Sequence, residues 1–166
     1  ADSLNRALRL ARGELFGALD ADSFVEHSAL RKMVGYFTDP TMMAVTPSLK
    51  IYNPRTFWQK VQYVEYLLGV YLRKVFSYFG SIHVTPGPFT IFRKSFFETH
   101  GQYDTHNLTE DIEVALRIQH HNYRIQNTID ASVHTVGPQS WGALIRQRKR
   151  WYIGFINNVI VLQALV

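Results

Sequence analysis

The sequence predicts an α/β fold in a single domain. Its 166 residues are 46% hydrophobic, which is enough apolar material for one proper core. Short apolar runs typical of strands alternate along the chain with longer segments whose apolar residues recur at helical spacing. The chain contains no cysteine, which excludes disulfides and thiolate metal sites.

The first third of the chain supplies two helices and two strands. Apolar residues at helical spacing predict a helix over 4–11, so we expect the sequence to begin inside a fold. A strand over 15–19 follows, and segment 23–26 has the pattern of a capping box that opens a second helix. A second strand is expected over 42–46, with an extended piece through 49–52.

The rest of the chain is dominated by helices. Segment 56–79 predicts a long helix that is apolar on all sides, which indicates a helix buried under an adjoining part of the protein or one lying at a membrane surface. The remaining expected elements, in order, are a Pro/Gly-rich turn entering a strand over 84–92, a helix that Thr109 caps, short strands over 123–128 and 131–136, and a final helix that Ser140 caps.

Two aspartates directly after the first predicted strand are candidates for a divalent cation site. Because residues i and i+2 of an extended chain point the same way, Asp20 and Asp22 can face one point. They stand where a strand reaches the edge of the sheet, which is where open α/β folds keep their active sites. Two hard oxygen ligands suit Mg²⁺ or Mn²⁺ carrying phosphate.

A second acidic pair, Glu110 and Asp111, lies in the first turn of a predicted helix. The helix dipole favours a carboxylate there and keeps it ionised at neutral pH, as a general base requires. Acidic residues are common in the first turn of a helix, however, and such a pair taken alone more often stabilises the helix N-terminus than takes part in catalysis.

A third group of polar residues belongs to the last predicted helix. Gln147, Arg150 and Trp151 are spaced to share one face, whereas Arg148 and Lys149 point elsewhere. A guanidinium binds phosphate and an indole offers a flat platform for a sugar or base. The alternative is a solvated basic face or a lipid-contacting patch, which would suit the net charge of +5.

Other candidate motifs are weaker or missing. His134 lies in a strand-like segment and is a possible third metal ligand, although a lone histidine more often has a structural role. The sequence contains no glycine-rich phosphate loop, no Gly-x-Ser-x-Gly elbow and no His-Glu-x-x-His pair. P-loop nucleotide hydrolysis, α/β-hydrolase chemistry and zinc proteolysis are therefore disfavoured.

In this order and at these separations, the three segments resemble the inverting family-2 glycosyltransferases with the GT-A fold, particularly the membrane-bound branch of cellulose, chitin, hyaluronan and poly-N-acetylglucosamine synthases. Residues 20–22 match the family's DxD motif, 109–111 its TED motif and 147–151 its Q-x-x-R-W motif. Residues 1–5 and the stretch from Gly87 to Arg93 extend the similarity over essentially the whole chain. The fold that the resemblance implies is a partial GT-A (Rossmann-like) mixed sheet flanked by helices.

The resemblance also implies a reaction and a role for each matched residue. A hexose would pass with inversion from a nucleotide-sugar, expected to be a UDP-sugar, to a hydroxyl of a polysaccharide or lipid-linked acceptor, in synthesis of a β-linked polysaccharide. Asp22 would bind Mg²⁺ or Mn²⁺, Asp20 would support the ion or contact the nucleotide, and Asp111 would deprotonate the acceptor. The other binding residues would be Gln147 and Arg150 for the diphosphate, and Trp151 and Glu110 for the acceptor.

Two departures from the family pattern bear on the domain organisation. Residues 1–152 would form a catalytic domain without the family's first strand-helix-strand, and 153–166 would begin an interfacial or transmembrane helix. The full-length protein would then act at the cytoplasmic face of the cell membrane. Pro86 and Pro88 leave little room for the small, flexible turn often seen around Gly87 in the family.

Two other functions compete with this interpretation. A non-catalytic basic and aromatic module for anionic lipid or nucleic acid would explain the 146–150 cluster, but not the aspartate pairs, and we expect no nucleic acid partner. A metal-dependent phosphotransferase or nuclease would use the same aspartates without needing the indole of Trp151.

Overall fold

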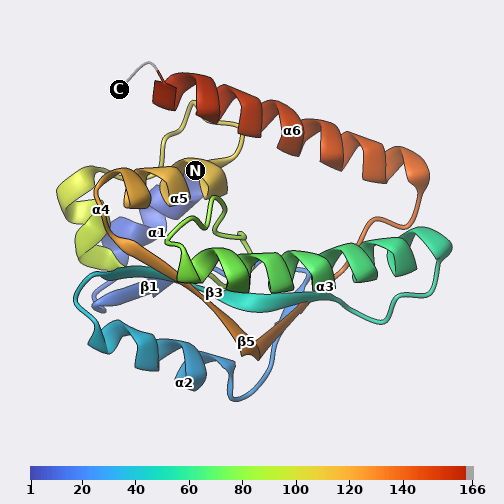
Figure 1. The fold of residues 1–166 in the computed structure, drawn as a ribbon, viewed down its shortest axis with the longest axis horizontal. Helices are drawn as coiled ribbons and strands as arrows, with labels where there is room; N and C mark the ends of the chain where they lie inside the picture. The colour runs from blue at the N-terminus through green and yellow to red at the C-terminus, as the bar shows by residue number, and fades with distance from the viewer. Residues whose placement is uncertain (164–166) are drawn as a thin grey trace.

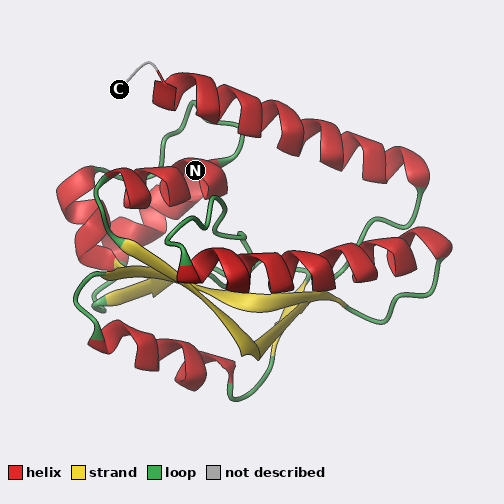
Figure 2. Ribbon diagram, in the orientation of Figure 1, coloured by secondary structure: helices red, strands yellow, loops and turns green. Residues whose placement is uncertain are grey.

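A computed structural model describes residues 1–163 and shows a five-stranded mixed sheet with helices on both faces (Figures 1 and 2). In spatial order, the strands are β1 (Leu15–Gly17), β4 (Ile91–Arg93), β3 (Met42–Ile51), β5 (Arg124–Thr135) and β2 (Ser23–Val25). The central pair β3 and β5 is parallel, and the other neighbours are antiparallel. β3 is buried along nearly its whole length, as expected for a central strand covered on both faces.

Helices cover the two faces unequally. The long helix α3 (Phe57–Tyr78) packs on β3 and β5, and the short helix α2 (Ala29–Val34), followed by the 3-10 turn η1 (Gly35–Thr38), covers the other face. Figure 1 shows three of the remaining helices gathered at one end of the sheet, and the last helix running above them and above α3. These helices are α1 (Asp2–Leu10), α4 (Lys94–His100), α5 (Glu110–His120) and the last one, α6 (Trp141–Gln163).

The apolar core has two parts, one on each side of the sheet. The larger part gathers around Phe92, Phe96 and Ile118 and joins β3 and β4 to α1, α4 and α5. The smaller part lies under α2, where Ala29 and Met33 pack against the sheet. The larger core fixes α5 on the sheet. The second acidic pair, Glu110 and Asp111, lies in the first turn of this helix and is positioned with it.

Several expected elements are present with changed bounds. The long helix begins at Thr56, whose hydroxyl accepts from the Gln59 amide while the Gln59 side chain accepts from Thr56, a complete capping box. The two strands expected over 123–128 and 131–136 are one strand, β5, which bends sharply where its register with β3 shifts (Figure 1). The pieces over 42–46 and 49–52 are likewise one strand, β3.

The prediction of a helix that begins at segment 23–26 is wrong. Ser23–Val25 is strand β2, paired antiparallel with residues 133–135 at the end of β5. The local pattern of a capping box is overridden because the sheet offers these residues backbone partners, and the Glu26 amide continues the pairing by donating to the Ser132 carbonyl over 3.1 Å. The helix starts later, after Ser28, and buries Ala29 and Met33.

The last helix runs unbroken from Trp141 past residue 153, where a boundary between domain and membrane segment is predicted. Ser140 caps it, since its hydroxyl accepts from the Ala143 amide over 3.3 Å. Among the described residues, no helix combines the length and apolarity needed to cross a bilayer. The predicted segment 153–166 ends with 164–166, which lie outside the described residues, so the boundary stays a prediction.

Candidate active site

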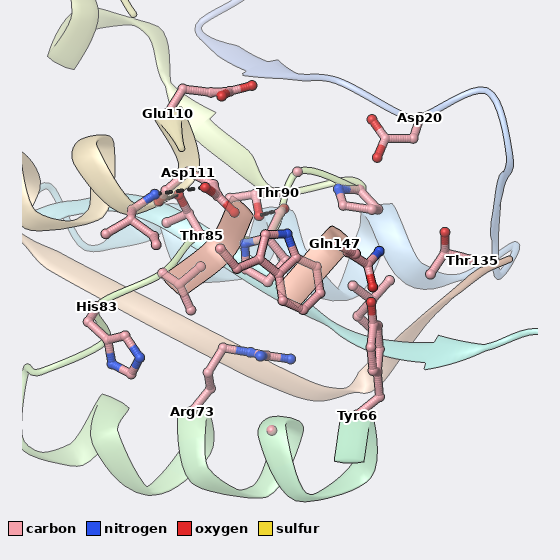
Figure 3. Close-up of a pocket in the computed structure, with 18 of the residues that line it drawn as sticks. Asp20, Tyr66, Arg73, His83, Thr85, Thr90, Glu110, Asp111, Thr135 and Gln147 are labelled. Carbon is pink, nitrogen blue, oxygen red and sulfur yellow. Dashed lines mark hydrogen bonds between the residues drawn. The ribbon is translucent and has the colours of Figure 1, made fainter. Parts of the chain in front are cut away.

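One cleft of about 780 Å³ opens between α3 and α6, above the ends of the central strands. Its walls come from the turn after β1, the loop before β4, the start of α5 and the facing sides of the two long helices. The structure brings the residues of the three motifs to this cleft, but not His134: Asp20, Asp22, Glu110, Asp111, Gln147, Arg150 and Trp151. Figure 3 shows Asp20, Asp111 and Gln147 around the same space.

The first aspartate pair lies in a turn, not at the end of a strand. β1 stops at Gly17, and the Ser23 amide donates to the Asp20 carbonyl over 3.0 Å, which closes a turn around Asp22. The predicted strand geometry is therefore wrong, although both carboxylates reach the cleft. The hydroxyl of Thr135, at the end of β5, lies 3.5 Å from Asp22 Oδ1 and ties the turn to the sheet.

The carboxylates of this turn repel one another and the second acidic pair. The pKa of Asp20 is raised, first by burial and then by the charges of Asp22 and Glu110. Gly87 approaches Asp20 closely, since a Cβ at Gly87 would lie 3.8 Å from Asp20 Oδ2. Acidic groups held together without a protein cation are stabilised by a bound cation.

The loop before β4 fixes the start of α5. The amide and the hydroxyl of Thr85 both donate to the backbone carbonyl of Asp111, over 3.0 and 2.8 Å. Thr85 is fully buried, and the hydroxyl of Thr90 closes the loop by donating to the Pro86 carbonyl over 2.6 Å. The Asp111 backbone is therefore held from two sides, by its helix and by this loop.

The Asp111 carboxylate is a stronger base than an ordinary aspartate. Burial raises its pKa to about 6, the neighbouring Glu110 charge adds to the rise, and the Ile112 amide and Arg150 oppose it. The helix start alone would lower the pKa, so burial outweighs the dipole effect on which the sequence argument relied. With a pKa of about 6 the group is still mostly ionised at pH 7, as a general base must be.

The α6 wall of the cleft presents the amide, guanidinium and indole that the helical spacing predicts. Gln147 Oε1 is buried and has no hydrogen-bond partner among the described residues, so it is available to a ligand. Arg148 does not line the cleft. It pairs with Glu65 of α3, and its guanidinium lies 4.3 Å from the centre of the Trp151 ring. Trp151 is thus held from behind by a stacked arginine.

The donor set suits a magnesium or manganese ion shared with phosphate. The described residues hold no group of three or more His, Asp or Glu side chains able to enclose a metal ion, and His134 packs against Tyr52 outside the cleft. Asp20 and Asp22 alone would leave most positions around an ion to water and phosphate. Mg²⁺ is usually bound in this way, through one or two carboxylates and substrate phosphates.

Comparison with known proteins decides the family. The family model described as glycosyl transferase family group 2 matches residues 16–166. The chain belongs to this family.

Curated relatives of this family group 2 domain include poly-beta-1,6-N-acetyl-D-glucosamine synthases. That of Staphylococcus aureus (strain COL) is 33% identical over 157 residues, covering 93% of this chain and 38% of the relative. That of Staphylococcus epidermidis is 32% identical with the same coverage. The chain thus spans little more than a third of the length of these relatives.

A solved structure confirms the fold class of the domain. The mannosyltransferase PcManGT from Pyrobaculum calidifontis, in complex with GDP-Man and Mn²⁺, superposes with a TM-score of 0.76 at 23% identity, covering 96% of this chain and 43% of that one. The predicted GT-A-like mixed sheet flanked by helices is therefore correct.

Sequence reasoning about the family group 2 domain missed several cleft residues. Thr85 and Thr90 have no local pattern that distinguishes them from ordinary turn residues, since their role depends on which backbone they meet. Tyr66 and Arg73 look like part of a uniformly apolar helix, yet both point from α3 into the cleft (Figure 3). The basic pair Arg73 and Lys74 within a largely apolar stretch is the signal that would have pointed to the second of these.

Proposed function

We propose that this protein is the catalytic part of a metal-dependent glycosyltransferase, which moves a sugar from a nucleotide-sugar to a hydroxyl acceptor with inversion at the anomeric carbon. The observation that carries the proposal is the shared cleft. It gathers an aspartate pair suited to a cation, a buried carboxylate of pKa about 6 and a helix face with amide, guanidinium and indole groups. Family membership supports the same reaction.

Asp111 is the proposed base. Its carboxylate would take the proton of the acceptor hydroxyl as the oxygen attacks the sugar, and its raised pKa makes that transfer easier than for an exposed aspartate. Thr85 holds the backbone that carries it, so the carboxylate keeps its place on the cleft wall. Glu110 beside it would hydrogen-bond the acceptor, and Trp151 would stack on its ring.

As the acceptor oxygen attacks the sugar, negative charge builds up on the departing diphosphate. Arg150 would offset that charge, and the side-chain nitrogen of Gln147, which lines the same wall, would donate to the phosphate oxygens. Asp22 and Asp20 would hold a Mg²⁺ or Mn²⁺ ion, which when bound supplies further stabilisation of the leaving group. Asp20 and Asp111 lie at different places around the cleft in Figure 3, which supports a displacement with the leaving group and the base on different sides of the sugar.

The relatives favour a polysaccharide product. Those that match are named as synthases of a poly-N-acetyl-D-glucosamine, so we propose a β-linked polysaccharide and a growing chain or lipid-linked sugar as acceptor. A UDP-sugar is our proposed donor; the structural neighbour instead binds GDP-Man, so the test includes both nucleotides. Action at the cytoplasmic face of the membrane is part of the same proposal.

Isothermal titration tests the donor site. UDP, UDP-sugars and GDP-mannose are titrated with Mn²⁺ or Mg²⁺ into the chain alone and into the complete gene product. We expect metal-dependent binding of one nucleotide, which Asp22→Ala abolishes. The matched control is Asp130→Ala, because Asp130 is exposed at the bend of β5 and outside the cleft.

Two results would contradict the proposal. No nucleotide binding by the complete gene product would remove the donor site and favour a lipid-binding module. If the Asp111→Asn variant binds nucleotide and transfers sugar as fast as the wild type, Asp111 is not the base. That result would favour a phosphotransferase that needs only the metal site.

A further inference from the structure

One charged side chain in the cleft has no place in the mechanism above. Arg73 projects from α3 into the cleft, and its Nε atom is shielded from solvent without a hydrogen-bond partner among the described residues (Figure 3). None of the described acidic side chains forms an ion pair with it. Glu65, the acid that lines the cleft from the same helix, is paired with Arg148.

Such an arrangement is costly to the free protein. The Nε–H group of Arg73, shielded from water without a partner among the described residues, loses hydration that nothing there replaces. Burial lowers the pKa of Arg73 to about 10, so it stays charged at neutral pH. A retained, unpaired cation in a cleft indicates a ligand that supplies the missing anion.

Arg73 is also separate from the acidic end of the cleft. Figure 3 shows it rising from α3 beside His83, across the space from Asp20 and Glu110. Burial and then the charge of Arg73 lower the pKa of His83, whereas the pKa of Asp20 is raised by burial, Asp22 and Glu110, with no contribution from Arg73. An anion bound at Arg73 would therefore lie away from the proposed cation site.

We infer that Arg73, together with the Tyr66 hydroxyl that lines the same cleft from α3, forms a second oxyanion subsite on the α3 wall, which binds a phosphate or carboxylate carried by the acceptor. The inference rests on the proposed function, in which the donor diphosphate belongs to the metal, Gln147 and Arg150. Arg73 can offer a fork of two donors to such a group, and Tyr66, which also lines the cleft, can donate a hydroxyl.

The test separates the two anion sites. In the complete gene product saturated with Mn²⁺ and UDP, we titrate glucose 1-phosphate, glucuronate and neutral glucose into wild type, Arg73→Gln and Arg73→Lys. We expect one of the two anionic sugars to bind better than glucose. Arg73→Gln should weaken that binding at least tenfold, and Arg73→Lys should fall between, because an ammonium keeps the charge without the fork.

Controls on α3 and in the donor site complete the experiment. Lys60→Gln removes an exposed charge from the same helix and should change nothing. Arg73→Gln should retain Mn²⁺-dependent UDP binding, whereas Asp22→Ala should lose it and still bind the anionic sugar. Without ligand, Arg73→Gln should melt at or above the wild-type temperature, since it removes a buried unpaired charge.

The outcomes that overturn the subsite are specific. Equal binding of the anionic sugars and glucose, or unchanged anion binding in Arg73→Gln, removes the oxyanion role. Loss of UDP binding in Arg73→Gln assigns Arg73 to the donor site. A melting temperature lowered in both Arg73 variants assigns it a structural role. These outcomes differ from a failure of the proposed transferase function, in which the wild type would bind no nucleotide.

Discussion

The side-chain amide of Asn158 donates to the hydroxyl of Thr109 over 2.9 Å and so joins the last helix to the residue before α5. Asn107 reinforces the junction, since its amide donates to Asn158 Oδ1 over 2.6 Å. The Thr109 hydroxyl is thereby occupied, and it does not cap α5 as the sequence predicts. The contact sets the distance between the helix that carries Asp111 and the helix that carries Gln147 and Arg150.

Gly154→Ala should break this junction. A Cβ at Gly154 would overlap the side chain of Thr109, with the Thr109 Cβ only 2.8 Å away, so the two helices must separate. We expect a loss of about 1–3 kcal/mol in the free energy of unfolding, the usual effect of overpacking a close contact. Chemical denaturation measures it, and sugar transfer should fall along with stability.

Gly142→Ala is the matched control for that variant. Gly142 lies in the first turn of the same helix, where a Cβ would stand 3.6 Å from an Arg146 nitrogen, an ordinary contact. Alanine should there be neutral or stabilising by up to about 1 kcal/mol. Equal effects of the two substitutions would show that the Thr109 contact does not restrain α6.

Asp111→Asn should abolish transfer and stabilise the free protein above neutral pH. Burial raises the Asp111 pKa from 3.8 to about 6, so between these values the folded state binds more protons than the unfolded state. Stability contributed by this group is therefore present at low pH and is lost as pH rises through about 6. The neutral amide escapes that loss, which we place at about 1–3 kcal/mol because the side chain is partly exposed.

Denaturation of wild type and Asp111→Asn at pH 4 and pH 8 checks the sign. The difference should be large at pH 8 and small at pH 4, whereas Asp130→Asn, at an exposed aspartate, should show no such trend. A variant less stable than wild type at pH 8 would mean that the Asp111 carboxylate makes a stabilising interaction when ionised.

Local patterns predicted the elements that depend on local signals. Helix α3 has its capping box, the start of α6 has Ser140, and the spacing of Gln147, Arg150 and Trp151 places them on one cleft wall. The three acidic and polar motifs therefore converge as the resemblance implies. Their catalytic and binding roles stay predictions until binding and transfer are measured.

The elements that sequence reasoning missed depend on partners distant in the chain. Ser23 joins a strand because the end of β5 passes beside it, and a local capping pattern carries no information about that neighbour. Thr109 bonds to Asn158 instead of its own helix for the same reason. The raised pKa of Asp111 depends on burial, which the first turn of a helix does not reveal.

Mn²⁺ alone should bind weakly and a nucleoside diphosphate should strengthen it. Only Asp20 and Asp22 are available as carboxylate ligands in the turn. The pKa of Asp20 is raised by burial and then by the charges of Asp22 and Glu110, and a bound cation offsets both effects. We expect Mn²⁺ and UDP together to raise the melting temperature more than the sum of the two separately, with Kd for Mn²⁺ lowered at least ~10-fold by UDP. Additive shifts, or a synergy retained in Asp22→Ala, would place the ion elsewhere.

Arg148→Ala should destabilise the protein more than Lys149→Ala, although the two residues are neighbours. The Arg148 side chain is only 14% exposed, pairs with Glu65 on α3 and stacks on Trp151, whereas Lys149 is exposed. We expect a loss of about 1–2 kcal/mol for Arg148 and less than about 0.5 for Lys149 by denaturation.

Arg148→Lys separates the two contacts of that arginine. A lysine keeps a charge for Glu65 but loses the flat face that covers the Trp151 ring. Because Trp151 is the proposed acceptor platform, this variant should raise KM for the acceptor about 3-fold, a loss of under 1 kcal/mol typical of a cation–π contact, while donor binding is kept. A lysine variant with wild-type KM would mean that the ion pair between α3 and α6 is sufficient to position the indole.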